Sequence, residues 1–544
     1  MKKRLIFCAV LFLAAVADTF ACTNLIVGKN ASTDGSTIVS YSADSYGLFG
    51  ELYHYPAATY PKGTMLKVYE WDTGKYLGEI EQARQTYNVV GNMNEYQVTI
   101  GETTFGGRPE LADSTGIIDY GSLIYIGLQR SRTAREAIKV MTDLVQQYGY
   151  YSEGESFTIA DPNEIWIMEM IGKGPGIRGA VWVAVRVPDD CISAHANQSR
   201  IHQFDMNDKE NCIYSPDVVS FAREKGYFSG VNKDFSFAYA PLDFGARRFC
   251  EARVWSYFNK FTDNGKDYLP YIEGKTNTPM PLFVKPKHKL SVQDVKDMMR
   301  DHYEGTPLDI SNDFGAGLYK TPYRLSPLNF KVGDREYFNE RPISTQQSGF
   351  VFVAQMRANK PDPIGGVLWF GVDDANMAVF TPVYCCATKA PVCYTRVDGA
   401  DYITFSWNSA FWIFNWVANM VYPRYDLMID DVRATQTELE TTFNEAQEGV
   451  EAAAAKLLEK DPAKAKAFLT NYTNMTAQST FDTWKRLGEF LVVKYNDGVV
   501  KRMKNGQFER NSIGQPAGVI RPGYPKEFLE EYVKQTGDRY KMPE

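Results

Sequence analysis

The chain has 544 residues, a formal net charge of −7, 44% apolar residues and 23% charged residues. These ordinary globular proportions exclude a disordered chain, a collagen and a small disulfide-stapled scaffold. The acidic balance argues against nucleic acid as a partner, because phosphate binding needs a basic surface. The length permits three or four domains or one large core with appendages, so individual motifs have to define the function.

The first 21 residues have the order of features found in a secretory signal peptide. Basic residues at 2–4 precede an apolar run over 5–16, which is too short to span a bilayer, and small residues Thr19 and Ala21 stand at the cleavage positions. We therefore expect an exported protein, periplasmic or extracellular, with no integral membrane segment after processing.

Cleavage after Ala21 makes Cys22 the first residue of the mature protein. A free α-amine has a pKa of about 7.7 to 8.0 and a thiol about 8.5, so the neutral amine can take the thiol proton. Nucleophile and base then belong to one residue, and the uncleaved precursor should be inactive. A lipoprotein also begins with cysteine, but Phe20 is bulky where a lipid-attachment signal needs a small residue. Lipid anchoring is the less favoured alternative.

The residues after Cys22 have the pattern of a β-hairpin. Segments 23–28 and 36–41 are rich in β-forming residues, and segment 29–35 between them is rich in turn residues. Asp44 follows the second predicted strand, where its carboxylate would hold the α-amine of Cys22. A solvated turn aspartate is the alternative interpretation.

A Cys-Thr start, a strand, a D-G-S-T turn, a second strand and an aspartate together resemble the N-terminal-nucleophile cysteine hydrolases. Among these the chain is most similar to the cysteine dipeptidases of the dipeptidase A type, with bile salt hydrolases and penicillin V acylases more distant. The resemblance implies an α+β fold, a four-layer αββα sandwich with antiparallel sheets, and no cofactor. It extends in order over residues 22–390 through the segments NEYQVTIGETTFGG (94–107), IADPNEIWIMEMIG (159–172), VWVAVRVPDDCISAHANQSRI (181–201), FGARRFCEARVWSYFN (244–259), DHYEGTPLD (301–309), STQQSGFVFVAQ (344–355) and DPIGGVLWFGVDDA (362–375).

The resemblance also implies particular residues around the nucleophile. In the family an arginine and an aspartate spaced R-x-x-D hold the amine and the thiolate. Here Asp44 matches, but Tyr41 replaces the arginine, so another cation has to stabilise the thiolate. Asn197 in HANQSRI falls on the position of an oxyanion-hole amide, a donor worth about 100 to 1000-fold in rate. Thr104 aligns with a second oxyanion donor, through its side chain or its backbone N–H.

Two charged residues are candidates for contact with the substrate or the nucleophile. A Glu102 carboxylate in the GETTF turn would pair with the free ammonium of a dipeptide, whereas acylases for bile salts or penicillins have no ammonium to place there; a surface glutamate is the alternative. Arg248 precedes Phe249 as the arginine does in the acylases, so we assign it to the active site, with Arg253 as the rival. Either arginine would support the thiolate or bind a substrate carboxylate.

The remaining metal-binding and redox residues give weaker signals. The five histidines form no HExxH or other paired motif, so we expect no metal site. Disulfides are compatible with export, but the spacing leaves the pairing open among Cys191, Cys212, Cys250, Cys385, Cys386 and Cys393.

The composition becomes helical beyond residue 405. Apolar residues at spacings of four and three from Leu439 to Leu457 predict an amphipathic helix, and further helices are expected over 462–471 and 480–495. The aromatic segment 411–425 contains two asparagines and is expected to pack on the core rather than in a membrane.

Three parts are therefore predicted: a signal peptide over 1–21, a catalytic domain over 22–400 and a helical extension over 401–544 packed on the core. The predicted function is hydrolysis of dipeptides through a thioester acyl-enzyme. Alternatives are an amidase or acylase of the same fold acting on N-acylated small molecules, and a non-catalytic, lipid-anchored surface protein. Expected partners are small peptides, and a homo-oligomer remains compatible with the sequence.

Overall fold

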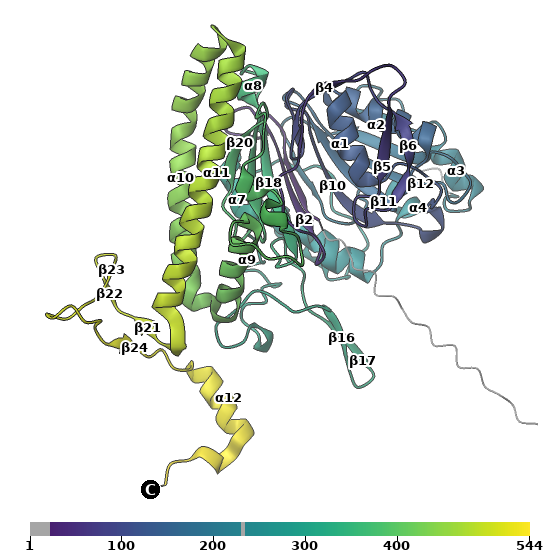
Figure 1. Cartoon of the computed structure of the whole chain (residues 1–544). Helices are drawn as coiled ribbons and strands as arrows, with labels where there is room; N and C mark the ends of the chain where they lie inside the picture. Colours follow the sequence, from purple (N-terminus) through teal and green to yellow (C-terminus); the bar gives the residue numbers. More distant parts are fainter. Residues whose placement is uncertain (1–21, 230–233, 544) are drawn as a thin grey trace, which may run out of the picture.

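A computed structural model describes residues 22–229 and 234–543. The predicted signal peptide lies outside the described residues. Two large antiparallel sheets and several helices make up the body (Figure 1), and this confirms the predicted α+β class.

The six-stranded sheet carries the predicted hairpin. Its first two strands are β1 and β2, which pair antiparallel with Ile26 opposite Val39 and lie within or close to the predicted segments. Asp44 is the last residue of β2 rather than a residue beyond it. The strand order is β14 (Ile192–His195), β1 (Asn24–Val27), β2 (Thr37–Asp44), β18 (Ser348–Met356), β19 (Val367–Val372) and β20 (Thr381–Tyr384).

The eight-stranded sheet is apolar on both faces. In its strand β12, Ile165 and Ile167 belong to the core shared with the six-stranded sheet, whereas Trp166 and Met168 belong to the core under two helices. Covering both faces explains why this strand consists of apolar residues interrupted only by Glu169. The order is β15 (Cys212–Tyr214), β13 (Ala180–Arg186), β12 (Ile165–Gly172), β11 (Gly154–Ala160), β10 (Thr99–Gly106), β9 (Met93–Asn94), β8 (Val89–Val90) and β3 (His54–Tyr55).

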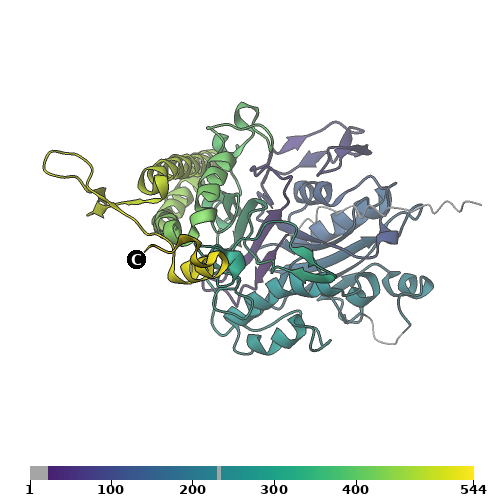
Figure 2. The same cartoon turned by 90° about the horizontal axis from the view of Figure 1, so that it is seen from below.

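Helices cover the outer face of each sheet. Helices α1 (Tyr120–Arg130) and α2 (Ala134–Tyr148) pack on the eight-stranded sheet, and longer helices flank the six-stranded sheet on the opposite side of the molecule (Figures 1 and 2). Strands β1, β2, β10 and β11 bring the two sheets face to face. The shorter helices are α3 (Val218–Glu224), α4 (Phe235–Tyr239), α5 (Ala252–Phe261), α6 (Leu269–Ile272), α7 (Val292–Met298) and α8 (Asp362–Gly365).

The long helices are α9 (Ala410–Val421), α10 (Tyr425–Leu458) and α11 (Pro462–Tyr495). The last of these is one helix where two were predicted, over 462–471 and 480–495. Its middle has low helix propensity, but Thr473 and Ala477 are buried there, and the Thr473 hydroxyl accepts a hydrogen bond from the Tyr384 N–H of β20. Packing on the sheet has overridden local propensity.

Buried ion pairs fasten α10 to the body. Arg300 pairs with Glu440, and Arg357 pairs with Glu451, with all four side chains less than a tenth exposed. The aromatic segment that becomes α9 is also largely buried. Within the described residues, no helix is both long and apolar enough to cross a membrane.

Several small elements project from the body. Hairpins β5–β6 and β4–β7 lie near α1, hairpin β16–β17 extends outward, and a tail with no buried residue in its helix α12 ends the described chain (Figure 1). Their bounds are β4 (Ala58–Thr59), β5 (Met65–Tyr69), β6 (Tyr76–Glu81), β7 (Gln85–Thr86), β16 (Asn329–Val332), β17 (Arg335–Phe338), β21 (Val500–Lys501), β22 (Met503–Lys504), β23 (Gln507–Phe508), β24 (Val519–Ile520) and α12 (Lys526–Thr536).

Candidate active site

Cys22 lies directly before β1, between the two sheets, and only 3% of it is exposed. Its thiol donates a hydrogen bond to Glu102 Oε1 at 3.5 Å, and its Sγ lies 3.6 Å from the Tyr41 hydroxyl. Burial, together with the negative charges of Glu102 and Asp44, raises the pKa of the thiol well above its usual value. In this state the sulfur is a neutral thiol.

Asn197 approaches Cys22 through the sheet register. Strand β1 pairs with β14 so that Asn24 faces His195, and continuing this antiparallel register by two residues sets Cys22 opposite Asn197. The backbone of Asn197 is left-handed, with φ of 59°, a conformation that asparagine tolerates better than most residues. Its amide donates to the Thr104 carbonyl at 2.7 Å.

Arg253 joins the nucleophile to Asn197. Its guanidinium donates to the Cys22 carbonyl at 2.6 Å and to the Thr23 hydroxyl at 2.8 Å, and also to Asn197 Oδ1 at 2.9 Å. Burial and neighbouring Arg341 lower the pKa of Arg253 to about 10, so it stays charged at neutral pH. The Arg253 guanidinium therefore holds both the backbone of Cys22 and the side chain of Asn197 in place.

Arg248, the arginine chosen from the sequence, takes a different position. It pairs with Glu340, and its guanidinium lies 5.4 Å from the centre of the Phe338 ring, at a surface hollow between Phe244 and Lys275. The structure thus brings the rival Arg253, and not Arg248, to the nucleophile.

Asp44 forms a buried ion pair with an arginine that the sequence analysis did not single out. Arg341 donates to Asp44 Oδ2 at 2.7 Å, and the two side chains are 5% and 0% exposed. The Ser348 hydroxyl donates to the other oxygen at 2.6 Å. Asp44 is therefore held rigidly at the end of β2, next to Cys22.

Substituting Asp44 with asparagine is expected to destabilise the fold by about 3 kcal/mol, because Arg341 would remain buried without its carboxylate. Urea unfolding followed by fluorescence measures the change. The control is Asp143→Asn, which breaks an exposed pair with Lys139 and should cost less than about 1 kcal/mol. Equal midpoint shifts in the two variants would contradict the predicted role of the buried pair.

Tyr41 and Glu102 form the wall next to the thiol. The Tyr41 hydroxyl donates to Glu102 Oε1 at 2.5 Å, and Glu102 is 1% exposed. The Tyr41 ring packs against Phe350 and Phe352 of β18. Tyr41, which stands at the position of the arginine in the family's R-x-x-D string, thus places a neutral phenol against the buried carboxyl of Glu102.

Thr104 lies two residues after Glu102 on β10. Its hydroxyl donates to Glu155 Oε1 at 2.7 Å, while its carbonyl accepts from Asn197. Thr104 therefore links the Asn197 loop to a second buried glutamate on β11. Glu155 was not singled out from the sequence, because it has no motif of its own.

A third buried glutamate holds the loop that carries Asn197. Glu169 of β12 accepts from the Ser199 hydroxyl and from the backbone N–H groups of Arg200 and Ile201. Burial raises the pKa of Glu169 to about 7. Glu169 lies on the same face of β12 as the isoleucines around it. This pattern could have identified Glu169 from the sequence, since a carboxyl on an apolar strand face needs hydrogen-bond partners.

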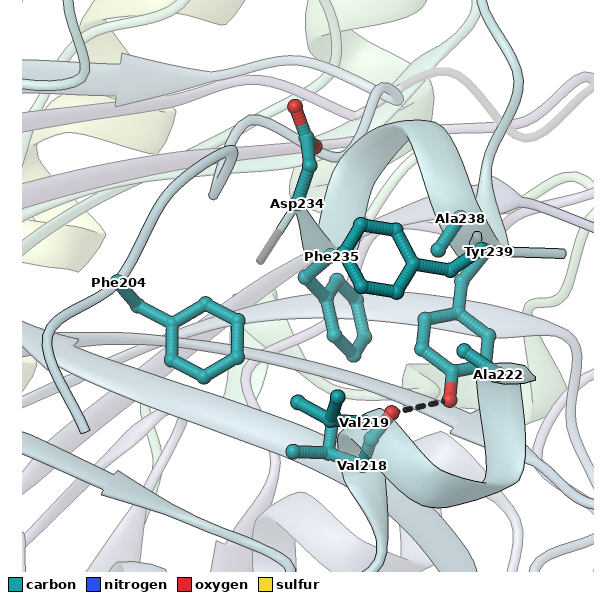
Figure 3. A pocket seen from close by; sticks show the side chains of 9 residues that line it. Phe204, Val218, Val219, Ala222, Asp234, Phe235, Ala238 and Tyr239 are labelled. Atoms are coloured by element: carbon teal, nitrogen blue, oxygen red, sulfur yellow. Dashed lines mark hydrogen bonds between the residues drawn. The ribbon is translucent and has the colours of Figure 1, made fainter. Parts of the chain in front are cut away.

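The hollow in Figure 3 contains no comparable chemistry. It is lined by apolar side chains, among them Phe204, Val218 and Phe235, and Asp234 is the one charged residue among the described residues that line it. Tyr239 points its hydroxyl to the Val218 carbonyl at 2.6 Å.

No group of three or more histidine, cysteine, aspartate or glutamate residues able to hold a metal ion occurs in residues 22–229 and 234–543. Cys385, Cys386 and Cys393 are buried free thiols. The site is therefore an assembly of a thiol, an amide, carboxyls and two buried arginines.

The chain belongs to peptidase family C69, whose family model matches residues 21–54 and 51–438. Among curated relatives, a "Probable dipeptidase" of Salmonella dublin is 29% identical over 406 residues, covering 71% of this chain and 85% of the relative. A "Probable dipeptidase" of Latilactobacillus sakei is 27% identical, covering 74% and 82%. "Dipeptidase A" of Lactobacillus helveticus is 24% identical, covering 72% and 80%.

These matches confirm the resemblance to the cysteine dipeptidases that the motifs indicated. The protein is an enzyme, a peptidase of the cysteine type.

Proposed function

We propose that this enzyme hydrolyses dipeptides with Cys22 as an N-terminal nucleophile, in a four-layer αββα sandwich of the N-terminal-nucleophile type. The observation that carries the proposal is the buried Cys22 thiol at the start of β1, in contact with the Glu102 carboxyl and tied to Asn197 through Arg253. The names of the relatives support the substrate class.

Each group has a separate role in the proposed reaction. After removal of residues 1–21, the neutral α-amine of Cys22 takes the thiol proton, and the thiolate attacks the peptide carbonyl. The Asn197 amide and a backbone N–H near Thr104 stabilise the oxyanion. The α-ammonium then protonates the departing amine, and water hydrolyses the thioester.

Asp44 and its partner Arg341 are proposed to position the α-amine. The Asp44 carboxylate is fixed by Arg341 and Ser348, and its negative charge acts on Cys22, so it can stabilise a newly formed ammonium there. The family's R-x-x-D string places an arginine three residues before the aspartate. In this chain the arginine that pairs with Asp44 is Arg341, which is distant in sequence.

An acylase acting on N-acylated compounds is the competing function within the same fold. The buried carboxyl of Glu102 beside the nucleophile favours a substrate that brings a cation, since an unpaired buried carboxylate is costly. A dipeptide with a free amine supplies that cation, and an N-acylated compound does not.

The enzyme beginning at Cys22 is expected to hydrolyse free dipeptides with kcat/KM at least about 100-fold above that for the same dipeptides carrying an N-acetyl group, because truncating one partner of a buried charge pair commonly costs 2 to 5 kcal/mol. A panel of matched free and acetylated dipeptides, with release of the C-terminal amino acid and of acetate both quantified, measures the ratio. Faster turnover of the acetylated series would identify an acylase instead.

A further inference from the structure

Glu102 and Glu155 lie side by side on the eight-stranded sheet. Thr104 of β10 pairs directly with Glu155 of β11, and Glu102 is two residues before Thr104, so all three side chains lie on the same face. Glu102 and Glu155 are each 1% exposed. Two strands thus place two carboxyls together in the interior, next to Cys22.

The donors around this pair reach only one oxygen of each carboxyl. Glu102 Oε1 accepts from the Tyr41 hydroxyl, and Glu155 Oε1 accepts from the Thr104 hydroxyl. Glu102 Oε2 and Glu155 Oε2 are buried and accept a hydrogen bond from no other side chain or backbone donor among the described residues. The carboxyls interact with each other directly.

Two buried carboxyls in contact cannot both ionise without a cation between them, so the empty pair holds a proton. Burial and the charge of Glu102 raise the pKa of Glu155 well above its usual value, and burial also raises that of Glu102. The titratable groups that act on the pair include the acidic residues Cys22, Tyr41, Asp44, Asp72, Tyr120 and Tyr150. The nearby cations are already engaged, Arg341 with Asp44 and Arg253 with the Cys22 carbonyl and Asn197. The surroundings therefore favour binding of a cation.

We propose that Glu102 and Glu155 form one subsite, which binds the substrate's α-ammonium and releases a proton in exchange. The inference rests on the proposed dipeptidase function and names the group that recognises the free amine. In the empty subsite one proton is shared by the two carboxyls. When the ammonium enters, that proton passes to solvent, and the two Oε2 atoms accept hydrogen bonds from the ammonium.

The same exchange supplies a positive charge to the nucleophile. In a dipeptide the ammonium nitrogen is two bonds from the carbonyl carbon that the sulfur attacks, so an ammonium held by Glu102 lies close to Cys22 Sγ. A nearby cation favours the thiolate. The substrate thereby brings the cation that Tyr41, in place of an arginine, does not provide.

The exchange predicts a particular pH dependence. Because binding releases a proton, affinity for a free-amine dipeptide rises as pH increases toward the pKa of the pair, and falls again once the ammonium itself, with a pKa near 7.7 to 8.0, loses its proton. KM for free dipeptides should therefore pass through a minimum. An N-acetyl dipeptide has no ammonium to exchange, so its KM should vary less than about 3-fold over the same pH range.

Calorimetry of a dipeptide binding to the Cys22→Ala protein, in two buffers of different ionisation enthalpy, counts the protons released. We expect about one proton for the unmodified subsite at a pH well below that of lowest KM, where affinity still rises with pH, and no net release at the minimum itself. The Glu155→Gln variant should release fewer than about 0.2 protons on binding, because Glu102 then carries a full negative charge before the dipeptide arrives. It should also bind the dipeptide about 10-fold more weakly, because one carboxyl instead of two contacts the ammonium. Glu153→Gln, an exposed neighbour on the same segment, should match the unmodified subsite.

The outcomes separate the subsite from the function. Dipeptide binding without proton release well below the pH of lowest KM, or equal loss of free and acetylated dipeptide turnover in Glu155→Gln, overturns the subsite while the dipeptidase proposal stands. Absence of dipeptide hydrolysis by the enzyme beginning at Cys22 overturns the function. If Glu155→Gln does not fold, the KM minimum of the unmodified enzyme decides: a KM independent of pH for free dipeptides rejects the exchange.

Discussion

Replacing Cys22 with alanine is expected to reduce dipeptide turnover at least about 1000-fold, to the background of the assay. The sulfur is the proposed nucleophile, and removal of a nucleophile commonly costs several orders of magnitude in kcat. Dipeptide affinity, measured by calorimetry, should change little, because Glu102 and Asn197 remain in place. The measurement is kcat by amino-acid release, using protein that begins at residue 22.

Two controls accompany this variant. Cys191→Ala removes another buried thiol and should retain full activity. Cys22 preceded by one uncleaved residue keeps the thiol but turns the α-amine into an amide, and should lose nearly as much activity as Cys22→Ala. Undiminished turnover by Cys22→Ala would reject the mechanism, and full activity of the extended chain would reject the α-amine as base.

Replacing Arg253 with methionine should lower kcat/KM about 100 to 1000-fold and destabilise the fold by about 3 to 5 kcal/mol. The buried guanidinium donates to Cys22, Thr23, Ala196, Asn197 and Phe249. Methionine replaces the aliphatic part of the arginine side chain but leaves these acceptors without a donor, at about 1 to 3 kcal/mol for each buried group. Steady-state kinetics and urea unfolding report the two effects.

Arg248→Met is the matched control, because Arg248 is on the same segment and pairs with Glu340 near the surface. We expect less than a 5-fold change in kcat. Arg253→Lys should recover only part of the activity, since one ammonium cannot reach acceptors on both Cys22 and Asn197. A loss of kcat in Arg248→Met as large as that in Arg253→Met would restore the original assignment.

The hairpin beginning at Cys22 was predictable because its signals are local. Alternating β-forming residues and a turn rich in glycine, asparagine and aspartate determine two strands within 22 residues. The helices beyond residue 405 were predictable for the same reason, from their apolar spacing. The gap predicted inside α11 was wrong, because burial of Thr473 against β20 is a tertiary contact that local propensity does not report.

The arginine selected from the sequence is not the one that contacts Cys22 in the structure. Residues Ala246–Glu251, which include Arg248, form a π-helix before α5. Arg248 was selected from the resemblance, because it precedes Phe249. Arg253 stands among the buried residues Val254 and Tyr257 of α5, and an arginine on such an apolar stretch has to be paired. That burial pattern was the signal available in the sequence.

Arg341 and Glu155 were beyond sequence reasoning for a different reason. Arg341 meets Asp44 across 297 positions, and Glu155 meets Glu102 through the pairing of β10 with β11. Neither lies in a motif with the residue that it contacts. Partners of this kind are set by sheet topology, which a linear pattern leaves open until the strand order is known.

The neutral, enclosed thiol of Cys22 also bears on the chemical durability of the enzyme. Oxidants and alkylating agents attack the thiolate rather than the thiol. Here burial and the adjoining Glu102 keep the sulfur protonated at rest, while an arriving ammonium favours its ionisation. In the proposed mechanism the sulfur would therefore be reactive chiefly while a substrate occupies the site and blocks access, and the resting enzyme would be protected against irreversible oxidation of Cys22.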